Sequence, residues 1–343
     1  MTEGTTNRRT VLKGAVAGLA GLTLAPVARE AFAQQAPAAV AVSDGFVMLT
    51  GAGGNILVRA SQSGQVLVDS GAAASTQRVL AALDELPGAG RIRTLFNTHW
   101  HLDQVGGNAA LGRLGATIVA HEKTRAHLAT DHYLPLEDRY EPALPPQAHP
   151  TETFFSGGET LVDGERVQYG HLLQAHTDGD IYVYFRDANV LAVGDAVSPV
   201  RDPELDWFGG GWLGGRVESL EKLLQVSDAQ TRIVPGYGPV VDRAELQAEF
   251  DMTLVLFDRM LELVRRGMSA QDMLDAGLME GLDRTFDDPF RFAYDAYKGY
   301  WAHHNSLAPD LLWWPLLRNA RLSRSCACSP ASVRPPPTVR SPL

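Results

Sequence analysis

The segment that most constrains this chain is a run of metal-ligand residue types that directly follows a short apolar stretch. Residues Ile92–Phe96 are bounded by turn signals, which predicts a buried strand. His99, His101 and Asp103 follow at intervals of two residues, and in extended backbone that spacing places the three side chains on one side. Because two neutral imidazoles and a carboxylate suit zinc or a similar divalent ion, the segment predicts a metal site where the strand ends.

Four other segments, taken in order with residues 97–108, resemble the motifs of metallo-β-lactamase fold hydrolases. They are an apolar strand with an acidic turn at 66–71, a histidine-containing segment at 175–180, a carboxylate at 193–195 and a loop at 233–239. Five ordered motifs are a specific signal, although each alone would be weak. The resemblance covers residues 40–245 and implies an α/β fold: the αββα sandwich of two mixed β-sheets between helical layers, followed here by a C-terminal helical extension.

The resemblance implies a first metal site that is complete in this chain. Its ligands are His99, His101 and His176, and Asp195 lies close by as the carboxylate that bridges two ions in relatives. Many relatives that hydrolyse β-lactams have a cysteine at the position of Asp195. The difference argues against hydrolysis of penicillins or carbapenems.

The second metal site that the resemblance implies is incomplete. Asp103 is a retained ligand type, but Gln104 and Tyr237 stand where relatives have histidines. A neutral amide and a phenol with a pKa near ~10 are poor zinc ligands at neutral pH. Because both replacements fall on the same site, we expect one zinc ion per chain, with iron as the alternative metal.

A zinc site with three histidines and an open position supports hydrolysis, since bound zinc lowers the pKa of water to about 7. Asp103 is expected to orient that water as a general base or to carry the leaving-group proton. Tyr237 and Gln104 are expected to donate hydrogen bonds to a developing oxyanion. Asp69 is expected to support the metal loop from behind rather than to bind the ion. The expected substrate is a small molecule: an ester, lactone, thioester or related carbonyl compound.

Two other functions stay open at this stage. Persulfide dioxygenases of this fold use the positions of His99, His176 and Asp195 as a 2-His-1-carboxylate iron site, so a mononuclear iron oxygenase is one alternative. A non-catalytic, metal-binding member of the family is the other. The number and identity of bound metal ions distinguish the three functions.

Composition limits the partners of the chain. Hydrophobic residues make up 45% of 343 residues, which is enough for a substantial core. The formal net charge is −10, which disfavours nucleic acid and anionic lipid as partners. The two cysteines, Cys326 and Cys328, lie near the C-terminus, so the expected folded region has no disulfide and no thiolate ligand.

The first 33 residues resemble a twin-arginine export signal. Residues 7–13 contain the pair Arg8 and Arg9, residues 14–27 form an apolar stretch, and residues 31–33 read Ala-Phe-Ala, a cleavage site. The apolar stretch is short and rich in small residues, which disfavours a membrane span. We therefore expect a periplasmic protein with no membrane insertion after the signal is removed.

Hydrophobic periodicity and turn residues predict the remaining organisation. Strands are expected at 45–50, 55–58, 65–68, 116–120, 180–185 and 189–193, a hairpin at 161–169, a long surface loop at 130–152, and helices at 75–86, 108–114, 218–224, 243–266, 269–280 and 288–303. The expected units are a metallo-β-lactamase-like domain at 34–245, a helical extension at 246–317 and a disordered or frameshifted tail at 318–343. Aromatic residues at 290–301 are expected to pack helices or to form a homodimer contact.

The export signal makes a testable prediction. Replacing both Arg8 and Arg9 by lysine should trap uncleaved precursor in the cytoplasm, because the twin-arginine pair is what the export route reads. Cell fractionation followed by immunoblotting measures the distribution. Periplasmic protein of unchanged amount and length would contradict the prediction.

Overall fold

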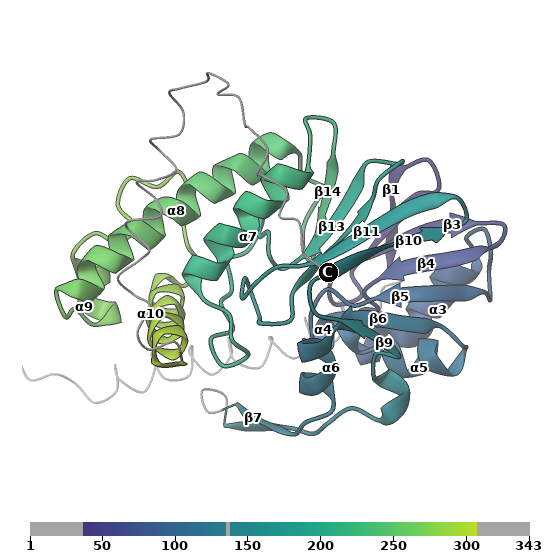
Figure 1. The fold of residues 1–343 in the computed structure, drawn as a ribbon, viewed down its shortest axis with the longest axis horizontal. Coiled ribbons are helices and arrows are strands. Elements are labelled where there is room, and N and C mark those ends of the chain that lie inside the picture. The colour runs from purple at the N-terminus through teal and green to yellow at the C-terminus, as the bar shows by residue number, and fades with distance from the viewer. Residues whose placement is uncertain (1–36, 135–137, 307–343) are drawn as a thin grey trace, which may run out of the picture. The chain divides into compact units, whose positions relative to one another are not determined.

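Two mixed β-sheets face each other in the computed structural model, which describes residues 37–134 and 138–306 (Figure 1). The first sheet has the strand order β1-β2-β3-β4-β5-β6-β9 and the second the order β10-β11-β12-β13-β14. The strands of the first sheet are β1 (Ala38–Ser43), β2 (Phe46–Thr50), β3 (Ile56–Ser61), β4 (Gly64–Val68), β5 (Ile92–Phe96), β6 (Thr117–His121) and β9 (Glu152–Phe154). Those of the second are β10 (Gly157–Val162), β11 (Glu165–His171), β12 (Ile181–Phe185), β13 (Val190–Gly194) and β14 (Arg232–Pro235).

Apolar side chains from both sheets fill the space between them. Strands β1 to β4 are antiparallel neighbours, and β4, β5, β6 and β9 run parallel. The buried cluster between the sheets joins Phe46 and Phe96 of the first sheet to Ile181 and Phe185 of the second. Phe46 and Phe185 meet edge to face, with ring centroids 4.9 Å apart, a favourable aromatic geometry.

Helices cover the outer faces of both sheets (Figure 1). Leu83 and Leu111, from α3 and α5, pack on the first sheet, whereas Leu220 and Leu246, from α7 and α8, pack on the second. The fold is therefore the αββα sandwich, as predicted. The α-helices are α3 (Thr76–Asp84), α4 (Leu102–Val105), α5 (Asn108–Arg113), α6 (Glu122–Leu128), α7 (Leu213–Val226), α8 (Arg243–Arg265), α9 (Ala270–Asp275) and α10 (Pro289–Ser306).

The C-terminal helices form a further core with α7. Leu256 and Met260 of α8, Met273 of α9 and Phe292 of α10 are buried in one cluster with Leu213 of α7. Within the described residues no helix is both long and apolar enough to cross a membrane. Residues 1–33 and the tail from residue 318, which carry the predictions on export and disorder, lie outside the described residues.

Most predicted elements are present, but not every strand was predicted, and two expectations about the elements were wrong. The strand β1 was missed because Ala38–Ser43 is largely exposed and shows no clear alternation. Residues 130–152 are not one loop, because β7 (His132–Leu134) and β8 (Arg139–Glu141) pair within them. The helix α7 starts earlier than predicted, directly after Trp212.

Two stacked histidines join the two sheets near the metal loop. His121 ends β6 and His171 ends β11, and their rings lie parallel with centroids 3.8 Å apart. Each ring also bonds to a backbone carbonyl, that of Phe155 and that of Asp178 respectively. Burial, and then the neighbouring His121, lower the pKa of His171 to about 4. Both histidines are therefore structural and neutral at pH 7.

The stacked histidines predict that the folded state becomes less stable in acid. Unfolded His171 has its ordinary pKa of 6.5 and folded His171 a pKa of about 4, so between these values the unfolded chain binds a proton that the folded chain does not. Stability should therefore fall as the pH drops from 6.5 towards 4, by at most about 1.4 kcal/mol per pH unit for one proton. The variant His171→Gln should flatten this part of the curve.

Denaturant titrations of the chelator-treated protein at several pH values measure this effect. Chelation removes the separate pH dependence that metal binding would add. If the wild type and His171→Gln show the same dependence between pH 4 and 6.5, His171 does not titrate as described.

Candidate metal centre

Three histidines from two loops converge at one edge of the sandwich. His99 and His101 lie between β5 and α4, and His176 lies between β11 and β12. The ring centroids are 4.7 to 4.9 Å apart, and the rings stand nearly perpendicular to one another. One nitrogen from each ring lies within 4.8 Å of the other two. This geometry brings the three predicted ligands of the first site together.

The outward nitrogens of His101 and His176 are fixed by acceptors. His101 Nε2 lies 3.0 Å from Asp206 Oδ2, and His176 Nδ1 lies 3.0 Å from the carbonyl oxygen of Glu204. Because a carboxylate and a carbonyl can only accept, both outward nitrogens carry the hydrogen. The inward nitrogens, His101 Nδ1 and His176 Nε2, lie 3.0 Å apart, so a hydrogen on one of them bonds to the other, and a bound cation would take the place of that hydrogen.

The third ring is held by a relay of hydrogen bonds. Asp69 accepts from both the backbone N–H and the hydroxyl of Thr98, at 2.8 and 2.7 Å. The Thr98 oxygen in turn lies 3.0 Å from His99 Nδ1 and accepts its hydrogen. His99 Nε2 is then left buried and without a hydrogen-bond partner among the described residues. Asp69 thus lies behind the loop, at the place expected for it.

The inward nitrogens of the three histidines could bind a divalent cation. Neutral imidazoles with bonded outer N–H groups and converging inner lone pairs are how proteins present histidine to zinc. Burial opposes a charge on His101, but the hydrogen bond and negative charge of Asp206 outweigh it and raise its pKa to about 10. Burial and the two neighbouring rings lower the pKa of His99. A metal that binds here at neutral pH therefore displaces a proton from His101.

The residues at the position of the second site bond to one another. The prediction that Asp103 continues an extended segment was wrong, because α4 begins at Leu102. The Tyr237 hydroxyl donates to Asp103 Oδ2, and Gln104 Nε2 lies 3.4 Å from Asp195 Oδ1. Burial, followed by the charge of Asp103, raises the pKa of Tyr237, so its phenol stays neutral and serves as a donor.

Two further charged residues border this position, and the sequence reasoning missed both. The Arg201 guanidinium lies over the Tyr237 ring, 3.1 Å from its centroid, which is a favourable cation–π geometry. Glu204 lies beside Asp195 and His176, with ligand atoms of the three within 4.8 Å of one another. A cavity of about 20 Å³ touches Asp195, Arg201, Glu204 and Tyr237, which is room for a single water molecule.

Asp195 lies between the histidines and this cavity. Its Oδ2 is 3.9 Å from His176 Nε2, and burial raises the pKa of its carboxyl to about 6. The backbone of Gly236 approaches it closely: a Cβ at that position would lie 1.8 Å from Asp195 Oδ1. A residue with any side chain at 236 would push the carboxylate away.

Comparison with known proteins identifies the family of this chain. The family model of the metallo-beta-lactamase superfamily matches residues 50–245, and the chain belongs to that superfamily. The "Metallo-beta-lactamase type 2" of Bacillus cereus is 27% identical over 200 residues, which are 58% of this chain and 72% of that protein.

Two solved structures share the fold at lower identity. A metallo-beta-lactamase from Pontibacter korlensis has a TM-score of 0.52 at 20% identity and covers 64% of this chain and 99% of its own. A stereoselective inverting sec-alkylsulfatase from Pseudomonas sp. has a TM-score of 0.57 at 17% identity and covers 86% of this chain and 55% of its own. With hydrolases among its relatives and a histidine-rich site, this chain is of the metallo-hydrolase class.

The contact between His101 and Asp206 makes a prediction. Asp206→Asn should weaken zinc binding about 10- to 100-fold, because the carboxylate both orients the ring and raises its basicity. Competition with a chromophoric chelator measures the dissociation constant. The matched control is Asp178→Asn, which weakens a second Asp–His pair, with His127, of the same 3.0 Å length. Equal affinity in Asp206→Asn and wild type would contradict the assignment.

Proposed function

We propose that this chain is an exported hydrolase that holds one zinc ion on His99, His101 and His176 and acts on an ester, lactone, thioester or related carbonyl compound. The observation that carries the proposal is the convergence of three inward imidazole nitrogens whose outward nitrogens are all bonded. The proposed location is the periplasm, and its support is the twin-arginine pattern of residues 7–13.

The bound zinc would supply hydroxide at neutral pH by lowering the pKa of a bound water. Asp103 is the proposed general base, because its half-buried carboxylate is near enough to His101 for its charge to favour the protonated ring, and the proposed single-ion site leaves it without a metal. The Tyr237 hydroxyl donates to Asp103 and would hold that carboxylate in one orientation. This role replaces the expectation that Tyr237 donates to an oxyanion, because its hydrogen is already used.

The amide of Gln104 has a matching role on the other carboxylate. Its Nε2 faces Asp195, while its Oε1 is buried without a hydrogen-bond partner among the described residues. The backbone of Gly54 lies flat against this amide, with a Cβ there falling 2.1 Å from both of its polar atoms. Gln104 is therefore proposed to orient Asp195 rather than to contact the substrate.

A second candidate function follows from the position of Asp195. Its carboxylate, 3.9 Å from His176 Nε2, would complete a 2-His-1-carboxylate set with His99 and His176, which suits non-haem iron. Elemental analysis of protein purified without added metal separates the candidates. One equivalent of zinc supports the hydrolase, one of iron supports the oxygenase, and none supports a protein that is not a metalloenzyme.

The proposed base makes a prediction on turnover. Asp103→Asn should lower kcat at least ~10²-fold on any ester or lactone that a screen identifies, while one equivalent of zinc stays bound, as expected for loss of a general base. Tyr237→Phe should lower kcat about 10- to 100-fold, because it keeps the ring beneath Arg201 and removes only the bond that orients Asp103. Steady-state kinetics and elemental analysis check both variants.

The control is Tyr184→Phe, which removes another tyrosine hydroxyl bond, that to Asn189 at the far end of β12. It should leave kcat unchanged. Full activity in Asp103→Asn would exclude Asp103 as the general base. Two tightly held zinc ions in the wild type would exclude the mononuclear site.

A further inference from the structure

A fully buried arginine lies behind the loop that carries Asp195. Arg216, in the first turn of α7, has no exposed surface. Its Nη1 donates to the carbonyl oxygen of Asp195 at 3.0 Å, and its Nη2 donates to the hydroxyl of Ser198 at 3.0 Å. A guanidinium that bonds to two points of one loop fixes both its position and its direction.

The negative partner of this arginine comes from the next helix. Glu249 of α8 accepts from Arg216 Nη2 at 2.5 Å, and both its carboxylate oxygens lie 3.0 Å from the backbone nitrogen of Ser198. Glu249 is 7% exposed, so the charge pair is formed away from water. Residue 249 also lies beyond the segment that the superfamily model matches, which ends at 245.

The opposite end of the loop is tied to the metal side. Gly194, with a φ of +54°, turns the chain directly before Asp195, and its carbonyl accepts from the backbone N–H of Gly236 at 2.8 Å. A Cβ at residue 194 would lie 2.6 Å from the Thr98 hydroxyl oxygen, which is the group that bonds to His99. The loop thus lies between the histidine cluster and the pair Arg216–Glu249.

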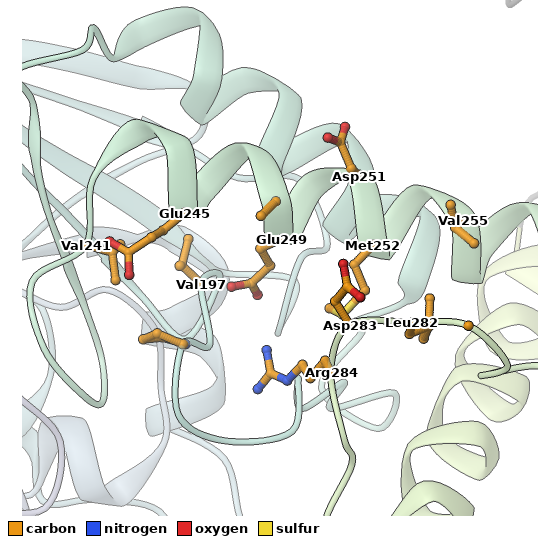
Figure 2. Close-up of a pocket in the computed structure, with 13 residues that line it drawn as sticks. Val197, Val241, Glu245, Glu249, Asp251, Met252, Val255, Leu282, Asp283 and Arg284 are labelled. Atoms are coloured by element: carbon orange, nitrogen blue, oxygen red, sulfur yellow. The ribbon is translucent and has the colours of Figure 1, made fainter.

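Packing alone does not hold the loop from behind. An open pocket of about 520 Å³ lies there, lined by Val197 and Pro199 of the loop, by Glu249 and Met252 of α8 and by Arg284 (Figure 2). Figure 2 shows the Glu249 and Arg284 side chains at this pocket. The loop has other contacts with the helices, since Val197 packs with Leu246 of α8 and Asp202 accepts from the backbone of Asp287 and Asp288. The hydrogen bonds of Arg216 and Glu249 are those that reach residues 195 and 198 directly.

We infer that Arg216 and Glu249 are positioning residues for the metal centre, through which the C-terminal helical extension sets the place of Asp195. The physical reason is that a buried ion pair has one arrangement that satisfies its charges, so the loop bonded to it also has one. The expected effect of the ion pair on metal affinity rests on the proposed metal site. The expected effect of the ion pair on the loop does not depend on any metal.

The test compares the full-length variant Glu249→Gln with the wild type and with Thr253→Val. The amide that replaces the carboxylate in Glu249→Gln would keep one acceptor for Ser198 but lose the charge that pairs with Arg216. Thr253 is a matched control, because it is also buried in α8 and its hydroxyl bonds only to the Glu249 carbonyl within the helix. Melting temperatures of the chelator-treated proteins record how far each change merely destabilises the fold.

Three readouts separate positioning from stability. In chelator-treated protein, hydrogen exchange of the peptide that contains residues 195–200 should speed up at least ~10-fold in Glu249→Gln and stay within about 2-fold of wild type in Thr253→Val. Titration with Zn²⁺ alone should show an affinity about 10- to 100-fold weaker in Glu249→Gln only. The absorption bands of bound Co²⁺ should also shift in Glu249→Gln, because Asp195 is displaced.

Unchanged exchange at 195–200 in Glu249→Gln would overturn the inference, whether or not the wild type binds metal. Equal losses of zinc affinity in Glu249→Gln and Thr253→Val would also overturn it, since both would then reflect general destabilisation. If Glu249→Gln does not fold, Ser198→Ala takes its place, because it leaves the ion pair intact and removes only the hydroxyl bond to Arg216. Faster exchange of 195–200 is expected there too, and its absence counts against the inference. A wild type without metal affinity contradicts only the proposed function.

Discussion

The convergence of three imidazole nitrogens in a largely buried space is the constraint on which the site depends. His101 Nδ1 and His176 Nε2 point at each other across 3.0 Å, and His99 Nε2 is buried without a partner among the described residues. Without a cation or a shared proton, such an arrangement is unfavourable, since each nitrogen has lost its hydrogen bond to water. The fold must therefore hold the rings in place from outside, and it does so by a separate acceptor for each outer nitrogen.

The charges around the histidines complete this constraint. Asp103, Asp195, Glu204 and Asp206 all lie close to the cluster, whereas Arg201 is the cation that borders the cavity beside it. In a partly buried site such an excess of carboxylates favours a bound cation. At the positions where the resemblance implies two further histidines, this chain has a phenol and an amide, and each donates to a carboxylate.

The sequence predicted those helices and strands that have a clear hydrophobic pattern. The apolar strands β5, β12 and β13 and the long helix α8 could be placed because each follows one hydrophobic period over its length. The strand β1 and the pair β7–β8 could not, because short exposed strands are selected by their pairing partners rather than by their own sequence.

Some residues of the candidate site could likewise be predicted from the sequence, and others could not. The three histidines and Asp195 could be located from motif spacing, but Asp206 could not, because it meets His101 only through the folding of a loop 105 residues further along the chain. Arg201 and Glu249 were equally invisible, since a charged residue in a loop or helix is usually solvated. A search for charged residues in the glycine-rich loop before α7 is the sequence signal that would have raised Asp206 as a candidate.

The dispersed origin of these contacts bears on when the site can form. The histidines come from the loops after β5 and β11, the acceptors for His101 and His176 from the loop before α7, and the support for Asp195 from α7 and α8. Among the described residues no short segment contains all three histidines, so the proposed metal site can form only once both sheets have packed. A chain of this kind gains from folding completely before it meets a compartment with different metals. The proposed twin-arginine route, which carries folded proteins, would meet that need, whereas export of an unfolded chain would leave the choice of metal to the periplasm.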